Sequence, residues 1–126
     1  MIEKKILIVD DDKDILMMLE ARLSKAGYKV LKANSGVDAI AIAKSEHFDL
    51  IILDIVMPDK GGEEIAEELK NNPGTENIPI LFLTCLYTKK EEMKQGHKID
   101  GNVIFAKPYN PQELLKEINS LLVSKV

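Results

Sequence analysis

Apolar residues recur along the chain in four uninterrupted runs, at residues 6–9, 50–53, 80–83 and 103–106. A strand with one face in water alternates apolar and polar positions, whereas a strand covered on both faces is apolar throughout. The four runs therefore predict buried strands of a parallel sheet. A fifth run, residues 28–33, does alternate and predicts a strand at the sheet edge.

The segments between these runs space their apolar residues as helices do, over residues 14–26, 37–44, 63–71, 89–95 and 110–123. The last segment has a clear start signal, because Asn110 can cap it and Pro111 suits the first helical position. Glu113 completes the pattern of a capping box. Strands and helices that alternate in this way predict an α/β fold, a doubly wound sheet of five parallel strands with helices on both faces.

The N-terminal segment places Lys4 and Lys5 before an apolar run, which is the order found in secretion signals. Three aspartates end that run at Asp10, well short of the roughly 7 apolar residues that an export segment needs. No apolar stretch elsewhere approaches the ~18 residues that span a bilayer. The sequence therefore predicts a soluble, cytoplasmic protein with no membrane partner.

Length and composition predict one compact domain over residues 1–126, with 45% hydrophobic residues to furnish its core. The net charge is −4 and there is no long basic run, which argues against direct nucleic-acid binding. Cys85 is the only cysteine, so the chain cannot form an internal disulfide, and no zinc-ligand pattern is present. A reducing compartment is favoured.

Polar side chains follow the apolar runs directly; they are Asp10, Asp11, Asp54, Thr84 and Lys107. In a doubly wound sheet the ligand site lies beyond the carboxyl ends of the strands, so these groups are expected to converge. Three carboxylates there repel each other by ~1 to 4 kcal/mol per pair at about 4 Å. A cation must balance them, and hard oxygen ligands select Mg²⁺.

A carboxylate beside Mg²⁺ can act as a nucleophile toward phosphorus and form an aspartyl phosphate. The transfer needs mainly positioning and charge neutralisation, which the metal and the ammonium group of Lys107 can supply. The hydroxyl of Thr84 can donate to a phosphoryl oxygen. This set of groups is sufficient for phosphoryl transfer onto the protein.

Four motifs, each at the end of a predicted strand, resemble the receiver domain of two-component response regulators: I-L-I-V-D-D-D, I-I-L-D-I-V-M-P-D-K-G-G, L-F-L-T and A-K-P-Y. The resemblance covers essentially the whole chain and implies the flavodoxin-like receiver fold, of a chemotaxis-regulator or phosphorelay kind. It implies that Asp54 accepts a phosphoryl group from a histidine kinase or a histidine phosphotransfer protein. A downstream output protein would then respond.

The same resemblance implies a role for each matching residue. Asp11 would bind Mg²⁺ directly and Asp10 mainly through water, with Asp54 and the backbone carbonyl of Val56 as further ligands. Lys107 would contact the phosphoryl group. Such a protein is a phosphoacceptor that assists its own phosphorylation and dephosphorylation, and is not an enzyme with an external substrate.

The resemblance also assigns the loops: Met57 and Pro58 match the acceptor loop, Gly62 its turn glycine, and Pro108 the loop after the last strand. Two positions depart from the family pattern. Ile104 stands where receivers usually carry an aromatic residue that reports phosphorylation. Val56 stands where a polar residue would position water, which predicts a long-lived aspartyl phosphate.

Other residues have plainer interpretations. Asp12 is expected to begin a helix and not to bind metal, while His47 and His97 are expected at the surface. Leu16, Leu19 and Leu23 have helical core spacing. Ile15 and Met18 flank them, either as a docking surface for the donor or as core residues. The polar segment 87–102 predicts a short or mobile fourth helix.

Three other functions remain open at this stage. The chain could be a phosphorylation-independent receiver-like interaction module, since Ile104 weakens the usual readout. It could be a magnesium-dependent aspartate-nucleophile phosphatase, although Val56 occupies the place of the second acid. A flavin carrier is disfavoured by the acidic first loop. The sequence does not identify the donor, the output partner or the oligomeric state, nor whether the chain is a complete protein or an excised domain.

Overall fold

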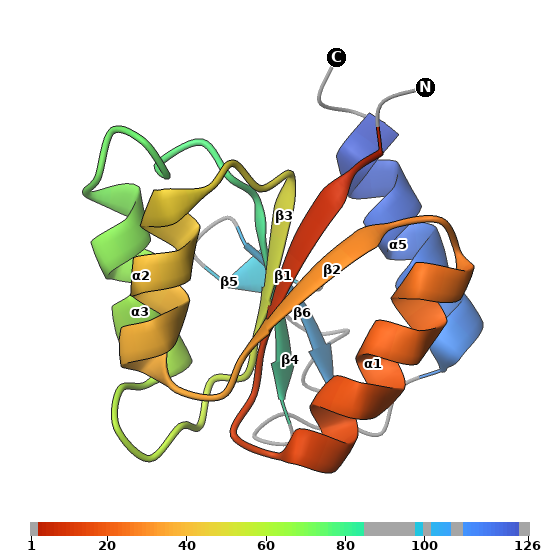
Figure 1. Cartoon of the computed structure of the whole chain (residues 1–126), viewed down its shortest axis with the longest axis horizontal. Coiled ribbons are helices and arrows are strands. Elements are labelled where there is room, and N and C mark those ends of the chain that lie inside the picture. The colour runs from red at the N-terminus through yellow and green to blue at the C-terminus, as the bar shows by residue number, and fades with distance from the viewer. Residues whose placement is uncertain (1–2, 85–97, 100–101, 107–109, 124–126) are drawn as a thin grey trace.

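The chain is described here by a computed structural model, which covers residues 3–84, 98–99, 102–106 and 110–123 (Figure 1). It forms three layers, with a central sheet between two pairs of helices. The helices are α1 (Lys13–Lys25), α2 (Gly36–Ser45), α3 (Gly62–Lys70) and α5 (Pro111–Val123). The helix predicted at residues 89–95 lies outside the described residues.

The sheet contains six strands: β1 (Lys5–Val9), β2 (Lys29–Ala33), β3 (Leu50–Leu53), β4 (Ile80–Thr84), β5 (Lys98–Ile99) and β6 (Asn102–Ala106). Their spatial order is β2-β1-β3-β4-β6-β5. All neighbours are parallel except β5, which pairs antiparallel with β6. The predicted five-stranded parallel sheet with β2 at one edge is thus confirmed. The two-residue β5 was missed because it is too short for any periodicity to show.

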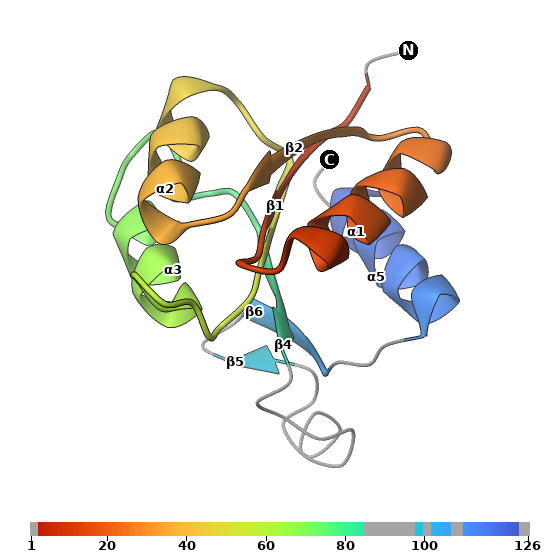
Figure 2. The same ribbon diagram turned by 60° about the horizontal axis from the view of Figure 1, so that its bottom comes forward.

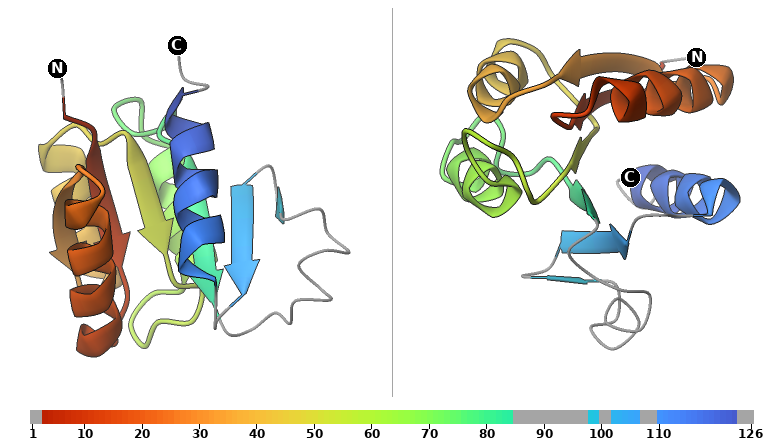
Figure 3. Two further views of the ribbon diagram at one scale, coloured as in Figure 1. Left: turned by 90° about the vertical axis from the view of Figure 1, so that its right-hand side faces the viewer. Right: turned by 90° about the horizontal axis from the view of Figure 1, so that it is seen from below.

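Helices cover both faces of the sheet, as predicted. Helices α1 and α5 lie on one side and α2 and α3 on the other, which is clearest in the view along the strands (Figure 3, right). The antiparallel β5 lies beyond β6 at the other edge from β2 (Figure 3, left). Within the described parts of the chain, no helix has the length and apolar content needed to cross a membrane.

Strand β1 shows why its apolar run is uninterrupted. Leu7 and Val9 belong to the buried cluster on the α2 and α3 side, whereas Ile6 and Ile8 belong to the cluster on the α1 and α5 side. All four side chains are buried. Burying a side chain of this size contributes about 1.5–3 kcal/mol, so packing a pair of helices on each face of the strand stabilises the fold.

The predicted helix ends are confirmed by hydrogen bonds. Asp12 caps α1, since its Oδ1 accepts from the backbone N–H groups of Asp14 at 2.9 Å and Ile15 at 3.4 Å. Gly27, just beyond the other end of α1, has φ of 99°, a left-handed conformation that glycine adopts without strain. The apolar face between these ends, Leu16, Leu19 and Leu23, is buried.

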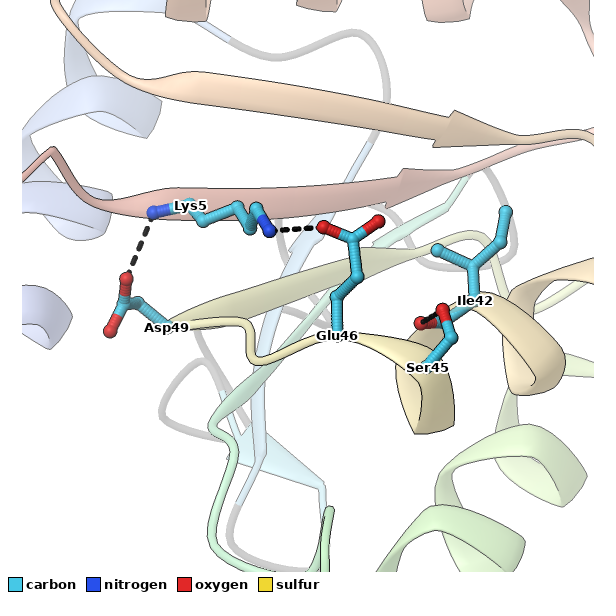
Figure 4. Close-up of polar contacts among 5 residues, drawn as sticks. All are labelled: Lys5, Ile42, Ser45, Glu46 and Asp49. Atoms are coloured by element: carbon cyan, nitrogen blue, oxygen red, sulfur yellow. Dashed lines mark hydrogen bonds and ion pairs between the residues drawn. The ribbon is translucent and has the colours of Figure 1, made fainter.

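The amino-terminal ends of β1 and β3 are tied together by backbone and side-chain contacts (Figure 4). The N–H of Lys5 donates to Asp49 Oδ2 at 2.9 Å, and the N–H of Asp49 donates to the carbonyl of Lys5 at 2.8 Å. The ammonium group of Lys5 pairs with Glu46 and, through that hydrogen bond, lowers the pKa of the Glu46 carboxyl. The hydroxyl of Ser45 donates to the carbonyl of Ile42. The pair between Lys5 and Glu46 therefore joins the end of α2 to β1, while the bonds between Lys5 and Asp49 join β1 to β3.

Helix α5 is capped as the sequence predicts, and this cap can be tested. Asn110 Oδ1 accepts from Gln112 N at 2.9 Å and from Glu113 N at 3.1 Å. Replacing Asn110 by Ala should lower the free energy of unfolding by about 0.5–2 kcal/mol, because two N–H groups lose their acceptor. Asn110→Ser keeps a capping oxygen, so its free energy of unfolding should stay within a few tenths of a kcal/mol of the wild-type value. Urea denaturation measures both, and equal stability of the two variants would contradict the capping role.

Candidate metal centre

The register between β1 and β3 brings two aspartates together. Val9 pairs with Leu53, and each strand is followed at once by an aspartate, Asp10 or Asp54. Backbone bonds continue past the strand ends, with Asp54 N donating to the carbonyl of Val9 at 3.0 Å and Asp10 N to that of Ala33 at 3.2 Å. In Figure 2 the edge where these strands end is turned toward the viewer. Both carboxylates thus start from fixed points on that edge.

Three carboxylates meet there. Asp10, Asp11 and Asp54 each place one oxygen so that the three atoms lie within 4.8 Å of one another. Asp10 is 3% exposed and Asp54 is 7% exposed, while Asp11 is open to solvent. At this separation two unit charges repel by about 3.5 kcal/mol or more with an effective dielectric constant of ~20. Buried charges are normally paired or coordinated to a metal, so the cluster is a candidate cation site.

Backbone amides orient the two buried carboxylates. Asp10 Oδ1 accepts from the N–H of Asp12 at 2.9 Å, and Asp54 Oδ1 accepts from the N–H of Val56 at 3.2 Å. Each bond spans two residues, so the loop that follows each strand holds the carboxylate of its own first residue. The two aspartates are therefore positioned before any ligand arrives, which lowers the cost of binding one.

The donor set fits a hard divalent cation. All three side chains offer carboxylate oxygens, and no histidine or cysteine among the described residues belongs to the cluster. His47 is 78% exposed and pairs with Asp49, in keeping with its predicted surface position. A site with two buried carboxylates and an exposed third leaves an open side for water or a phosphate oxygen, an arrangement typical of Mg²⁺. Asp12 caps α1, as predicted, and its carboxylate is not one of the three in the cluster.

The loop of residues 54–62, named the acceptor loop after the family motif that it resembles, places Val56 next to the cluster, since the Val56 N–H donates to Asp54 Oδ1. Ile55 and Met57 are buried on either side of Val56, which is 50% exposed. The loop closes where Gly62 N donates to the carbonyl of Ile55 at 2.8 Å. A Cβ at residue 62 would lie only 2.4 Å from the carbonyl oxygen of Asp54. Gly62 is therefore required because two stretches of backbone touch there, which gives a physical reason for the predicted turn glycine.

A second residue of this loop, Asp59, was missed by the sequence analysis. Its carboxylate accepts from the N–H groups of Gly36 at 3.0 Å and Val37 at 3.2 Å, at the start of α2. These bonds to the backbone, the one from Gly36 above all, lower the pKa of the Asp59 carboxyl. The contact joins residues 23 positions apart, and no local pattern reports such a contact.

Thr84 and Lys107 were predicted to complete the site. The backbone of Thr84 ends β4 and pairs with Ala106, so β4 and β6 finish at the edge where β1 and β3 finish. The side chain of Thr84 and the whole of Lys107 lie outside the described residues, as do Cys85 and His97. The roles assigned to Thr84 and Lys107 stay predictions.

Ile104, at the usual aromatic position, is a core residue. Ile104 is 0% exposed and lies in the cluster beneath α2 and α3, while its neighbour Phe105 is buried on the opposite face. The residue at the usual aromatic position is thus part of the core.

On α1, Met18 is 48% exposed and Ile15 is partly buried. Exposure of Met18 is compatible with the predicted docking surface, which stays a prediction.

In a doubly wound sheet the ligand site lies beyond the carboxyl ends of the strands, which is where the acidic cluster of this chain is found. Residues 6–119 match the family model described as the response regulator receiver domain. The chain belongs to this family, so the predicted family is confirmed. Receiver domains are phosphoacceptor switches of two-component signalling, where they interact with histidine kinases, and are not classical enzymes.

Similar proteins include both short and longer chains. Protein PilH of Pseudomonas aeruginosa is 37% identical over 120 residues, which cover 94% of this chain and 97% of PilH. The probable transcriptional regulator ycf27 of Cyanophora paradoxa is 38% identical over 95% of this chain but only 48% of its own length. The chain thus spans about half the length of several curated relatives that it matches.

Solved structures support the fold. The chemotaxis response regulator CheY4 of Vibrio cholerae superimposes with a TM-score of 0.83 at 35% identity, over 96% of this chain and 100% of that chain. This likeness confirms the predicted flavodoxin-like receiver fold for the chain.

The close backbone approach at Gly62 yields a prediction with a neighbouring control. Gly62→Ala forces a Cβ against the Asp54 carbonyl and should lower the free energy of unfolding by about 1–3 kcal/mol. Gly61→Ala places its Cβ 3.4 Å from the nearest atom, an ordinary contact, and should cost less than about 1 kcal/mol. Chemical denaturation compares them. If Gly61→Ala is the more damaging change, the steric account of Gly62 is wrong.

Proposed function

We propose that this chain is a phosphorylation-activated switch whose Asp54 accepts a phosphoryl group from a histidine kinase or histidine phosphotransfer protein. The observation that carries the proposal is the cluster of Asp10, Asp11 and Asp54, with oxygens within 4.8 Å at the carboxyl edge of a receiver fold. We infer that the receiver domain extends over residues 1–126, since α5 continues to Val123. A downstream protein would read the switch.

Mg²⁺ would be held by Asp10, Asp11, Asp54 and the backbone carbonyl of Val56. When bound, the ion would neutralise charge on the phosphoryl oxygens and on the clustered carboxylates. The protein's own contribution is position. Asp54 is fixed through its backbone bond to Val9 and through the Val56 N–H on its Oδ1, so the carboxylate need not reorganise during transfer.

The transfer itself is a displacement at phosphorus. A carboxylate oxygen of Asp54 forms a bond to phosphorus while the bond from phosphorus to the donor imidazole nitrogen breaks. The imidazole leaves with the electron pair and takes up a proton. Lys107 would contact the transferred group through its ammonium, and Thr84 would donate its hydroxyl to a phosphoryl oxygen. Later, water attacks phosphorus, the bond from phosphorus to the Asp54 oxygen breaks, and inorganic phosphate leaves Asp54 as a free carboxylate.

The setting of the switch is inferred from composition. A net charge of −4 disfavours direct nucleic-acid contact. A single cysteine suits a reducing compartment, so we place the protein in the cytoplasm. The surface of α1 formed by the exposed Met18 and the partly buried Ile15 is the one that we assign to the donor.

Phosphorylation by a small donor tests this function directly. Incubation with acetyl phosphate or phosphoramidate and Mg²⁺ should add the mass of one phosphoryl group, seen by intact mass spectrometry. Asp54→Ala should abolish the addition, whereas Asp38→Asn, which changes an exposed aspartate on α2, should retain it. Without Mg²⁺ the rate should fall sharply.

Two results would overturn the proposal. No added mass on the wild-type protein would favour a phosphorylation-independent interaction module, and addition that persists in Asp54→Ala would place the acceptor elsewhere. Continuous turnover of an external phosphoester would instead favour the phosphatase reaction.

Val56 should set the lifetime of the aspartyl phosphate. Its side chain is half exposed beside Asp54 but has no polar atom that could orient water. Val56→Asn should speed hydrolysis by about two- to tenfold, the effect of one added hydrogen bond. Met17→Asn adds the same amide at an exposed site on α1 and should leave the rate unchanged. Loss of phosphorylated protein over time is the measurement, and an unaltered rate in Val56→Asn would refute the inference.

A further inference from the structure

Two contacts attach the acceptor loop to the rest of the molecule, and a third hydrogen bond closes the loop on itself. At its start Asp54 N donates to the carbonyl of Val9 at 3.0 Å, and at its end Gly62 N donates to the carbonyl of Ile55 at 2.8 Å. Between them, the carboxylate of Asp59 reaches the amino-terminal end of α2. Val56 lies between the contacts made by Asp54 and by Asp59.

The attachment through Asp59 completes the hydrogen bonding of α2. The first N–H groups of a helix have no partner within the helix. Here those of Gly36 and Val37 donate to the two oxygens of Asp59, and that of Asp38 donates to the hydroxyl of Ser35 at 3.2 Å. The cap of α2 is therefore shared between a local residue and a residue of the acceptor loop.

Steric contact reinforces the same junction. A Cβ at Gly36 would lie 2.6 Å from the Cβ of Lys60, the residue after Asp59. The loop thus packs directly on the first turn of α2. The carboxylate of Asp59 also faces the positive end of the helix dipole, and the hydrogen bond from the Gly36 N–H lowers the pKa of this carboxyl.

From this junction we propose that Asp59 is a positioning residue, which holds the acceptor loop against α2 so that the Val56 carbonyl is in place for Mg²⁺. The proposal rests on the proposed function, because it concerns the same metal site. Asp59 does not belong to the carboxylate cluster itself. It acts through the loop: without its two bonds the loop is held less firmly against α2, and the cost of ordering it when the metal binds weakens affinity.

The test pairs Asp59→Ala with Ser35→Ala. Each variant removes part of the α2 cap, but only Asp59→Ala releases the acceptor loop. Both should lower the melting temperature, by roughly 2 to 8 °C. Mg²⁺ affinity should separate them, with a loss of about three- to tenfold in Asp59→Ala, at or below the low end for residues that support metal ligands. The Mg²⁺ affinity of Ser35→Ala should stay within about twofold of the wild-type value.

Mg²⁺ affinity is best measured on the whole chain by amide NMR titration with Mg²⁺ alone, since the chain has no tryptophan. Asp59→Asn retains one acceptor oxygen and should recover part of the lost affinity. With acetyl phosphate, Asp59→Ala should need more Mg²⁺ to reach half of its maximal phosphorylation rate, while its rate at saturating Mg²⁺ stays near wild type. A loss of folded protein would instead lower the rate at saturating Mg²⁺, so a higher Mg²⁺ requirement with an unchanged saturating rate points to the metal site.

Each contrary result has its own meaning. Unchanged Mg²⁺ affinity in Asp59→Ala with a lowered melting temperature would reduce Asp59 to a helix cap and overturn the proposal. Equal losses in Asp59→Ala and Ser35→Ala would assign the effect to α2 stability, which also overturns it. Wild-type protein that binds no Mg²⁺ would instead refute the proposed function, and the positioning role with it.

Discussion

The pairing of β1 with β3 is the constraint on which the rest of the structure depends. It sets Val9 opposite Leu53, and thereby Asp10 beside Asp54. A slip of one residue would turn each side chain of a strand to the opposite face. Because both faces of β1 are buried, under different pairs of helices, such a slip would gain no better packing and would separate the two aspartates. The packing of the apolar core on β1 and β3 therefore fixes the relative position of Asp10 and Asp54, which lie just beyond the ends of these strands.

The site that these aspartates form carries an electrostatic cost that a bound cation would offset. Asp10 and Asp54 are buried like-charged groups, and three carboxylates within 4.8 Å repel one another. A sequence optimised for stability alone would not gather them there. Such local conflicts are expected where a structure is shaped by function. Two backbone amides, those of Asp12 and Val56, partly offset the cost by donating to the buried carboxylates.

Sequence patterns were sufficient for features that arise locally or from strand order. The apolar runs predicted the strands, and the residues after them predicted the aspartate cluster, because parallel strands end at one edge. The separate role of Asp12 followed from its place before α1. Contacts between distant segments were not accessible in this way: the bond from Asp59 to Gly36 depends on how the acceptor loop folds over α2. Strand β5 was too short to leave a pattern.

The position of Ile104 bears on how a change at Asp54 can spread. Ile104 shares a buried cluster with Ile55 and Met57 of the acceptor loop and with Ile65 of α3. A close-packed interior leaves little room for independent movement, so a shift of the loop must be accommodated by these neighbours. Ile104 is fully buried and has no ring that could swing between exposed and buried positions. In this chain the acceptor loop is therefore connected to β6 and to the α2 and α3 layer through core packing, with Asp59 as a second, polar connection to α2.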